Sequence, residues 1–153
     1  MEQLQEIYCK YTETLQAAKK ATSPLAGIFG TGGGISTHPC HQEFYDNVQR
    51  WTEEFLATQP DPDSVAEAVR FILVAGGAHK KLATYWFICA VQAHTKALIP
   101  MLSQDVSEAL RQEYDALYPE SSRLPLGQEI YELLCRQAGF VPPKKGFFSF
   151  LRK

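Results

Sequence analysis

Apolar residues recur every three or four positions along most of this chain, and no segment alternates apolar with polar residues as an amphipathic strand does. The first run places Leu4, Tyr8, Tyr11 and Leu15 at the spacing of one helix face. This spacing predicts a helix over residues 2–21 that buries a single stripe. Further helices are predicted to begin near His38, Asp63, Lys81, Ser103 and Leu126.

The segment from about residue 81 to 98 differs from the other predicted helices because it is apolar on nearly all sides. A helix of this kind normally has neighbours on most sides. The sequence therefore predicts an all-α single domain of five to six antiparallel helices packed around this central helix. We expect the helical domain to span residues 1–139, with a glycine-rich loop at 22–37 and a C-terminal tail at 140–153.

Residues near the predicted helix ends match the preferences for helix caps. Serine, threonine and aspartate side chains accept hydrogen bonds from the first N–H groups of a helix, and glycine commonly ends one. Gly139 is therefore the expected end of the last helix. The expected N-terminal caps are Thr37 or His38, Asp61 or Asp63, and Ser103.

Charge and cysteine content exclude several classes of protein. The formal net charge is −2 and no predicted helix carries a basic face, so nucleic acid is not an expected partner. The apolar stretches are too short to span a bilayer, and charged residues interrupt the region where a signal peptide would be apolar. The four cysteines form no CxxC pair, so we expect free thiols and a cytoplasmic location.

Five of the ten glycines lie between Gly27 and Gly34, just before the predicted second helix. The backbone N–H groups of Gly32, Gly33 and Gly34 could converge on a small anion, helped by the partial positive charge of the helix end. The known phosphate fingerprints do not fit. No lysine follows Gly34 directly, and a helix rather than a strand precedes the loop.

His38, Cys40 and His41 follow the glycines and complete this candidate ligand-binding site. The two histidines lie three positions apart and would share a helix face, so both could ligate one zinc ion. His79 and His94 are the candidate further ligands. No signature motif in the sequence requires a cofactor. If the histidines form a metal site, zinc is the expected metal.

Cys40 is the one candidate catalytic residue. It lies in the first turn of a predicted helix, where partial positive charge favours the thiolate, and histidine is close in sequence. A structural interpretation covers the same residues, because Cys40 and His41 precede Phe44 and would pack at the core. We favour the structural interpretation, since no local protease signature surrounds Cys40.

The last ten residues, KKGFFSFLRK (144–153), combine four cations with three phenylalanines and a leucine. This composition suits weak peripheral contact with a membrane, or insertion into a groove on a partner. We therefore expect a small helical module that binds a protein partner, through this tail or an exposed helix groove. The alternative is a metal- or small-anion-binding protein, or a hydrolase, built on the glycine loop and the His38–Cys40–His41 cluster. The sequence does not specify the oligomeric state.

Overall fold

The computed structural model describes residues 1–21, 38–74 and 84–140. Every regular element in these residues is helical, which confirms the all-α prediction. The α-helices are α1 (Glu2–Ala21), α2 (Cys40–Ala57), α3 (Pro62–Leu73), α4 (Tyr85–Gln92), α5 (Gln104–Leu117) and α6 (Pro125–Gln137). Three short 3-10 segments connect them: η3 (Ala93–Ala97), η4 (Ile99–Met101) and η5 (Glu120–Ser122).

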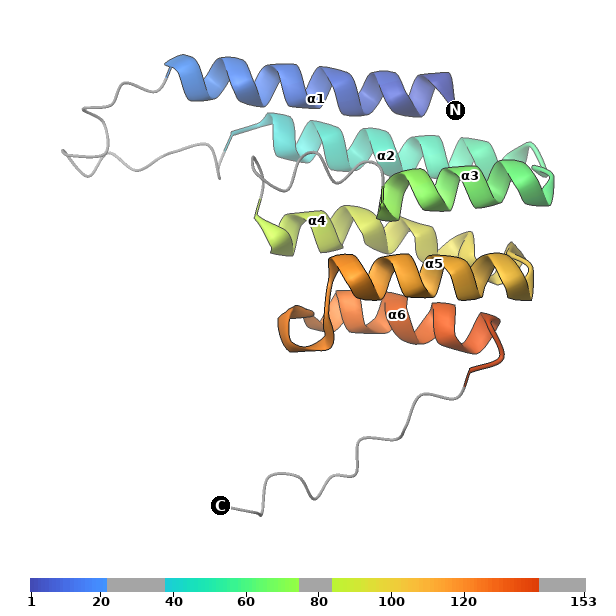
Figure 1. The fold of residues 1–153 in the computed structure, drawn as a ribbon. Coiled ribbons are helices and arrows are strands. Elements are labelled where there is room, and N and C mark those ends of the chain that lie inside the picture. Colours follow the sequence, from blue (N-terminus) through green and yellow to red (C-terminus); the bar gives the residue numbers. More distant parts are fainter. Residues whose placement is uncertain (22–37, 75–83, 141–153) are drawn as a thin grey trace, which may run out of the picture.

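The α-helices lie roughly side by side, and each runs antiparallel to the next one in the chain (Figure 1). α1 pairs with α2 at one side of the fold, and α5 pairs with α6 at the other. α4 lies between these pairs and packs against α2, α3 and α6. The helix predicted to be central therefore occupies the middle of the fold.

Aromatic rings hold α1 against its neighbours. The Tyr11 ring stacks on Phe44 of α2 with centroids 4.0 Å apart. The Tyr8 ring meets Phe44 edge-on at 4.8 Å and Phe71 of α3 at 5.0 Å. The stripe predicted for residues 2–21 is buried as expected, at Leu4, Tyr8, Tyr11 and Leu15.

Three predicted helix ends are confirmed. Asp61 accepts hydrogen bonds from two N–H groups in the first turn of α3, at 3.1 and 3.0 Å. Ser103 accepts one from the first turn of α5 at 3.4 Å. Gly139 follows α6 with a φ of 72°, a left-handed conformation that favours glycine.

The helix predicted over about residues 81–98 is shorter than expected. α4 ends at Gln92, and the chain continues as the tighter 3-10 segment η3. The hydroxyl of Thr95 donates to the carbonyl oxygen of Gln92 at 2.7 Å, which competes with the regular helical hydrogen bond to that oxygen. Residues 81–83, the predicted start, lie outside the described residues.

Two apolar side chains lie elsewhere than the helical periodicity predicts. Leu117 lies at helical spacing from Val106, Leu110 and Tyr114 and would therefore be expected on the buried stripe of α5, but it is 40% exposed, and Tyr118 is buried instead. The backbone leaves helical geometry at Tyr118, with φ −131° and ψ 76°, so its ring does not follow the stripe. Trp86 of α4, expected to have neighbours on most sides, is 67% exposed.

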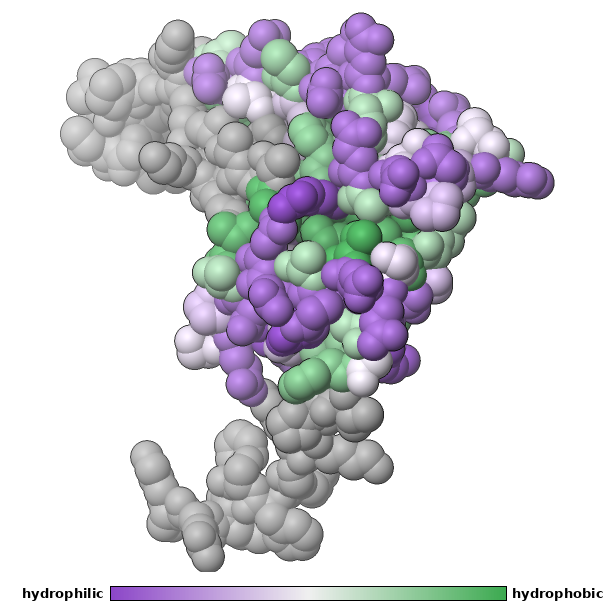
Figure 2. Space-filling view, turned by 45° about the vertical axis from the view of Figure 1, so that its right-hand side comes forward, coloured by the Kyte–Doolittle hydropathy of each residue, from purple (hydrophilic) through white to green (hydrophobic). Residues whose placement is uncertain are grey.

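The surface of the described residues contains both hydrophilic and hydrophobic areas. Figure 2 shows hydrophilic residues over most of one face, with hydrophobic residues gathered in its middle. Among the described helices, none has both the length and the apolar character needed to cross a membrane.

Candidate functional site

The junction at the start of α2 carries the residues that the sequence singled out. α2 begins at Cys40, with Pro39 at the cap position and no side-chain hydrogen bond from that residue. The imidazole of His38 accepts a hydrogen bond from the Cys40 N–H at 3.2 Å, so His38 caps the helix from one position earlier. Thr37 and the glycines Gly32, Gly33 and Gly34 lie outside the described residues.

His41 joins three helices at this junction. Its Nδ1 lies 2.8 Å from the hydroxyl oxygen of Tyr11 in α1. Its ring meets Phe87 of α4 edge-on, with centroids 4.9 Å apart. These contacts place His41 in an aromatic cluster between α1, α2 and α4, which is the packing role that the structural interpretation predicts.

Cys40 belongs to the hydrophobic core and is 6% exposed. Burial raises the pKa of the Cys40 thiol, and the nearby Glu43 carboxylate acts in the same direction, although a backbone hydrogen bond opposes them. The raised pKa favours the neutral thiol over the thiolate that a nucleophile needs. A catalytic role for Cys40 stays a prediction.

A small hollow lies beside Cys40, between α1 and α2. It measures about 20 Å³, and Tyr11, Thr14 and the ion pair of Lys10 with Glu43 line it together with Cys40. The hydrogen bond and charge of Lys10 lower the pKa of Glu43. A volume of this size holds about one water molecule, whereas small-molecule sites are typically about 300–1,000 Å³.

His94 lies apart from this junction, on η3. Its ring packs against Tyr45 of α2, with centroids 4.5 Å apart. Its Nε2 is buried and has no hydrogen-bond partner among the described residues. Burial lowers the pKa of His94, while the charge of Glu53 opposes this shift.

The zinc hypothesis names His38, His41, His79 and His94 as candidate ligands of one ion. His79 lies outside the described residues, and no group of three or more metal-ligating side chains forms within residues 1–21, 38–74 and 84–140. The Nδ1 atoms of His38 and His41 are both engaged in the contacts described above. The zinc site and the anion site therefore stay predictions.

A buried polar cluster, which the sequence analysis did not single out, joins α3, α4 and α5. The amide Nε2 of Gln92 donates to the carbonyl oxygen of Leu73 at 3.2 Å and to the hydroxyl oxygen of Tyr118 at 3.1 Å. The hydroxyl of Tyr114 donates to Gln92 Oε1 at 3.4 Å. Gln92 is 2% exposed, so its amide groups depend on these partners.

Gly127 of α6 closes this cluster from the other side. A Cβ at this position would lie 2.9 Å from the hydroxyl oxygen of Tyr85 and 3.2 Å from that of Tyr114. The Tyr85 hydroxyl is buried and makes no hydrogen bond of regular geometry among the described residues, although it lies near the Cys89 thiol and the Leu124 backbone. Its ring stacks on Tyr118 with centroids 5.1 Å apart. The tight contact explains why a residue without a side chain occupies this position of the helix.

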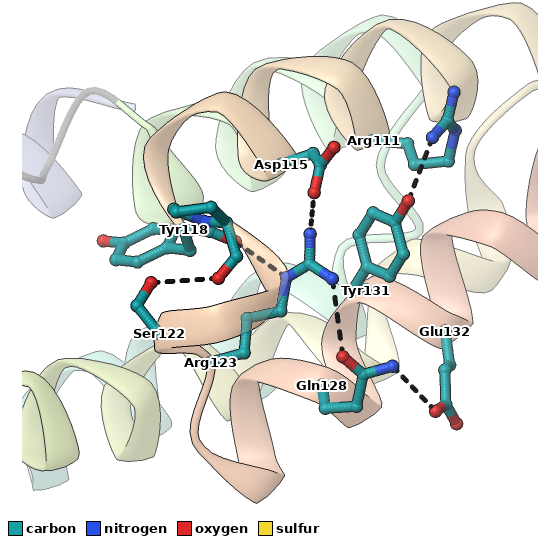
Figure 3. A network of polar contacts seen from close by, with 9 residues as sticks. Arg111, Asp115, Tyr118, Ser122, Arg123, Gln128, Tyr131 and Glu132 are labelled. Carbon is teal, nitrogen blue, oxygen red and sulfur yellow. Dashed lines mark hydrogen bonds and ion pairs between the residues drawn. The ribbon is translucent and has the colours of Figure 1, made fainter. Parts of the chain in front are cut away.

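Figure 3 shows a second polar network, centred on Arg123 in the link between α5 and α6. Its Nε donates to the carbonyl oxygen of Tyr118 at 2.7 Å, and its Nη2 contacts the Asp115 carboxylate. The guanidinium carbon lies 3.7 Å from the centroid of the Tyr131 ring, whose hydroxyl accepts a hydrogen bond from Arg111 at 3.0 Å. This network fixes the corner between two helices, which is a structural role. In the sequence, residues 119–125 (PESSRLP) form a polar break between two helical patterns, which gives no sign of this network.

The most exposed large apolar side chain among the described residues is Trp86, on the first turn of α4. Ala90 and Ala93 follow it at helical spacing and are half-buried, whereas Cys89, Val91 and Gln92 face the interior. Trp86 and Ala90 of α4, continued by Ala93 at the start of η3, form what we call the outer face of α4. Among the described helices, α2, α3 and α6 pack against α4, and Trp86 is the most exposed residue of this face.

Comparisons with protein-family models, curated proteins and solved structures found no match for this chain. Function is therefore inferred from the geometry of this chain alone.

Proposed function

We propose that this chain is a helical interaction domain that binds a protein partner through the outer face of α4, with Trp86 as the anchor. The exposed indole of Trp86 is the observation that carries the proposal. Tryptophan is enriched among the residues that dominate binding energy at protein interfaces, and loss of such an anchor costs about 2 kcal/mol or more. The small alanines beside it would allow a partner backbone to approach closely.

The rims of this face suggest the charge of the partner. Glu53 of α2 acts on His94 of η3, which places its carboxylate near one side of the central helix. On the other side, Glu129 of α6 pairs with Lys96 of η3. The whole chain has a formal charge of −2, and its last ten residues carry +4, which leaves −6 on residues 1–143. We therefore expect a partner segment that combines apolar residues with positive charge.

A reducing compartment suits this proposal. Cys9, Cys40, Cys89 and Cys135 are all free thiols in the structure. We propose that the interaction takes place in the cytoplasm, where such thiols stay reduced.

Affinity capture with the full chain tests the proposed function. We expect the wild-type chain and the Met101→Ala control, whose residue is 40% exposed, to enrich the same protein. The Trp86→Ala variant should lose at least nine-tenths of that enrichment, with unchanged helical content by circular dichroism. Equal capture by all three chains would contradict the assignment of Trp86 as the anchor.

A further inference from the structure

The outer face of α4 is open at Trp86, the position where an apolar partner would gain most from contact. The Trp86 side chain is 67% exposed, although it belongs to the most apolar helix of the described residues. Burying such an aromatic ring removes about 150–250 Å² from water. A segment that contributes aromatic rings of its own would suit this face.

The same chain carries a segment with the required chemistry. Residues 144–153 contain Phe147, Phe148 and Phe150, with two lysines before them and an arginine and a lysine after them. Its formal charge of +4 is opposite to the formal charge of −6 on residues 1–143. Exposed charges of opposite sign attract over about one Debye length, roughly 8–10 Å, so this complementarity favours contact at ordinary ionic strength.

The place where α6 ends allows this segment to reach α4. The side chain of Gln137, the last residue of α6, donates to the carbonyl oxygen of Leu102 at 2.6 Å, just after η4. The segment therefore leaves the fold near the end of the 3-10 segments that continue α4. From Tyr85 to Ala97 these elements measure about 20–25 Å, from helical rises of ~1.5–2.0 Å per residue. The residues after Phe140 number thirteen and can span about 43–47 Å when extended.

We propose that residues 144–153 bind the outer face of α4 of the same chain and bury Trp86 beneath their phenylalanines. This inference rests on the proposed function, because it assigns the chain's own segment to the face that a partner would use. The segment would then regulate the partner site by competing for it. Glu53 and Glu129 would attract the lysines and arginine that flank the phenylalanines.

Fluorine NMR of the full chain labelled with 5-fluorotryptophan tests the proposal. The chain has two tryptophans, and Trp51 is buried, so a Trp86→Phe variant assigns both signals. The measurement is the solvent isotope shift of each signal between H₂O and D₂O, which reports exposure of the ring. We expect the combined Phe147→Ser, Phe148→Ser and Phe150→Ser variant to increase the isotope shift of Trp86 at least twofold. Trp51 should not change, and the Ser149→Ala control should match the wild type.

A second variant keeps the test independent of the segment's apolar residues. Glu53→Gln combined with Glu129→Gln should increase the exposure of Trp86 in part, and added salt should have the same effect on the wild type. Equal isotope shifts of Trp86 in the wild type and the triple serine variant would overturn the proposal.

Two further results would overturn it in favour of another occupant. Protection of Trp86 that disappears on dilution would show that the segment binds a second copy of the chain. In the second result, the isotope shift of Trp86 is the same in the wild type and the triple serine variant, but the variant no longer co-sediments with vesicles of phosphatidylserine and phosphatidylcholine. This would show that the segment contacts membranes instead.

The two proposals fail separately. If the segment protects Trp86 but the Trp86→Ala variant captures the same proteins as the wild type, the proposed function fails and the intramolecular contact stands. If a partner depends on Trp86 and the triple serine variant neither exposes Trp86 nor increases capture, only the intramolecular contact fails.

Discussion

The hydroxyl of Tyr11 and the Nδ1 of His41 lie 2.8 Å apart and connect α1 to α2 across thirty positions of sequence. We expect Tyr11→Phe to lower the free energy of unfolding by about 0.5–1.5 kcal/mol, the usual net value of one hydrogen bond. Urea denaturation of Tyr11→Phe, His41→Ala and the double variant measures their coupling. Additive losses would show that the contact contributes nothing, and His41 would then act through ring packing alone.

Gly127→Ala tests the tight contact between α6 and the buried tyrosines. Alanine in place of glycine inside a helix normally stabilises by about 0.8–1.0 kcal/mol. Here the added Cβ would meet the Tyr85 hydroxyl oxygen at 2.9 Å, and forcing extra atoms into a packed core costs about 1–3 kcal/mol. We therefore expect a net loss of stability by urea denaturation.

Tyr85→Phe provides the matched background for that test. It removes a buried hydroxyl that makes no hydrogen bond of regular geometry among the described residues, so alone it should change the stability by less than about 1 kcal/mol. In this background Gly127→Ala should cost less than in the wild type. An equal cost in both backgrounds would show that the Tyr85 hydroxyl is not the obstacle.

Substitution by lysine should change the free energy of unfolding differently at two arginines that form ion pairs. The Arg123 side chain is 3% exposed and bonds Tyr118, whereas the Arg70 side chain, which pairs with Glu113, is 61% exposed. Arg123→Lys should lower the free energy of unfolding by about 2 kcal/mol, because lysine cannot reproduce the planar hydrogen bonds or the contact with the Tyr131 ring. Arg70→Lys should change it by less than about 1 kcal/mol, as for exposed pairs. Similar losses for both variants would contradict the central role of Arg123 in the corner.

His94 should make the fold sensitive to mild acid. Burial lowers the pKa of folded His94 below its ordinary value of 6.5, so between the two values the unfolded chain binds more protons. Stability from this group is therefore present above about pH 6.5 and is lost as the pH falls towards the lower, folded value. We expect the melting temperature to fall between pH 7.5 and 5.5, and His94→Phe to reduce that fall. His38→Gln is the control, and an unchanged pH dependence in His94→Phe would exclude His94 as its source.

Much of the helical framework could be predicted because burial of one face imposes a regular spacing. The stripe of α1 and the caps at Asp61 and Ser103 are local patterns of this kind. The structural interpretation of the junction also had a local basis, since Cys40 precedes Phe44 by one helical turn and both lie in the core.

The remaining features depend on partners distant in sequence. An all-apolar helix gives no sign of which side lacks a neighbour, so the exposure of Trp86 could not be predicted from α4 alone. Arg123 looked like part of a polar link, and its burial depends on Tyr131 of the following helix. Gln92 likewise interrupts an apolar run, and only Leu73 and Tyr118 make its burial favourable.

The change from α4 to η3 has a geometric consequence for the contacts of η3. A 3-10 segment advances by about 120° per residue and an α-helix by about 100°, so the five residues of Ala93–Ala97 accumulate an angular offset of about 100°. His94 and Lys96 lie on opposite sides of this segment. His94 contacts Tyr45 of α2, and Lys96 pairs with Glu129 of α6. The 3-10 segment therefore rotates the side chains that follow Gln92 relative to the faces of α4. This rotation sets which neighbouring helices the side chains of η3 contact.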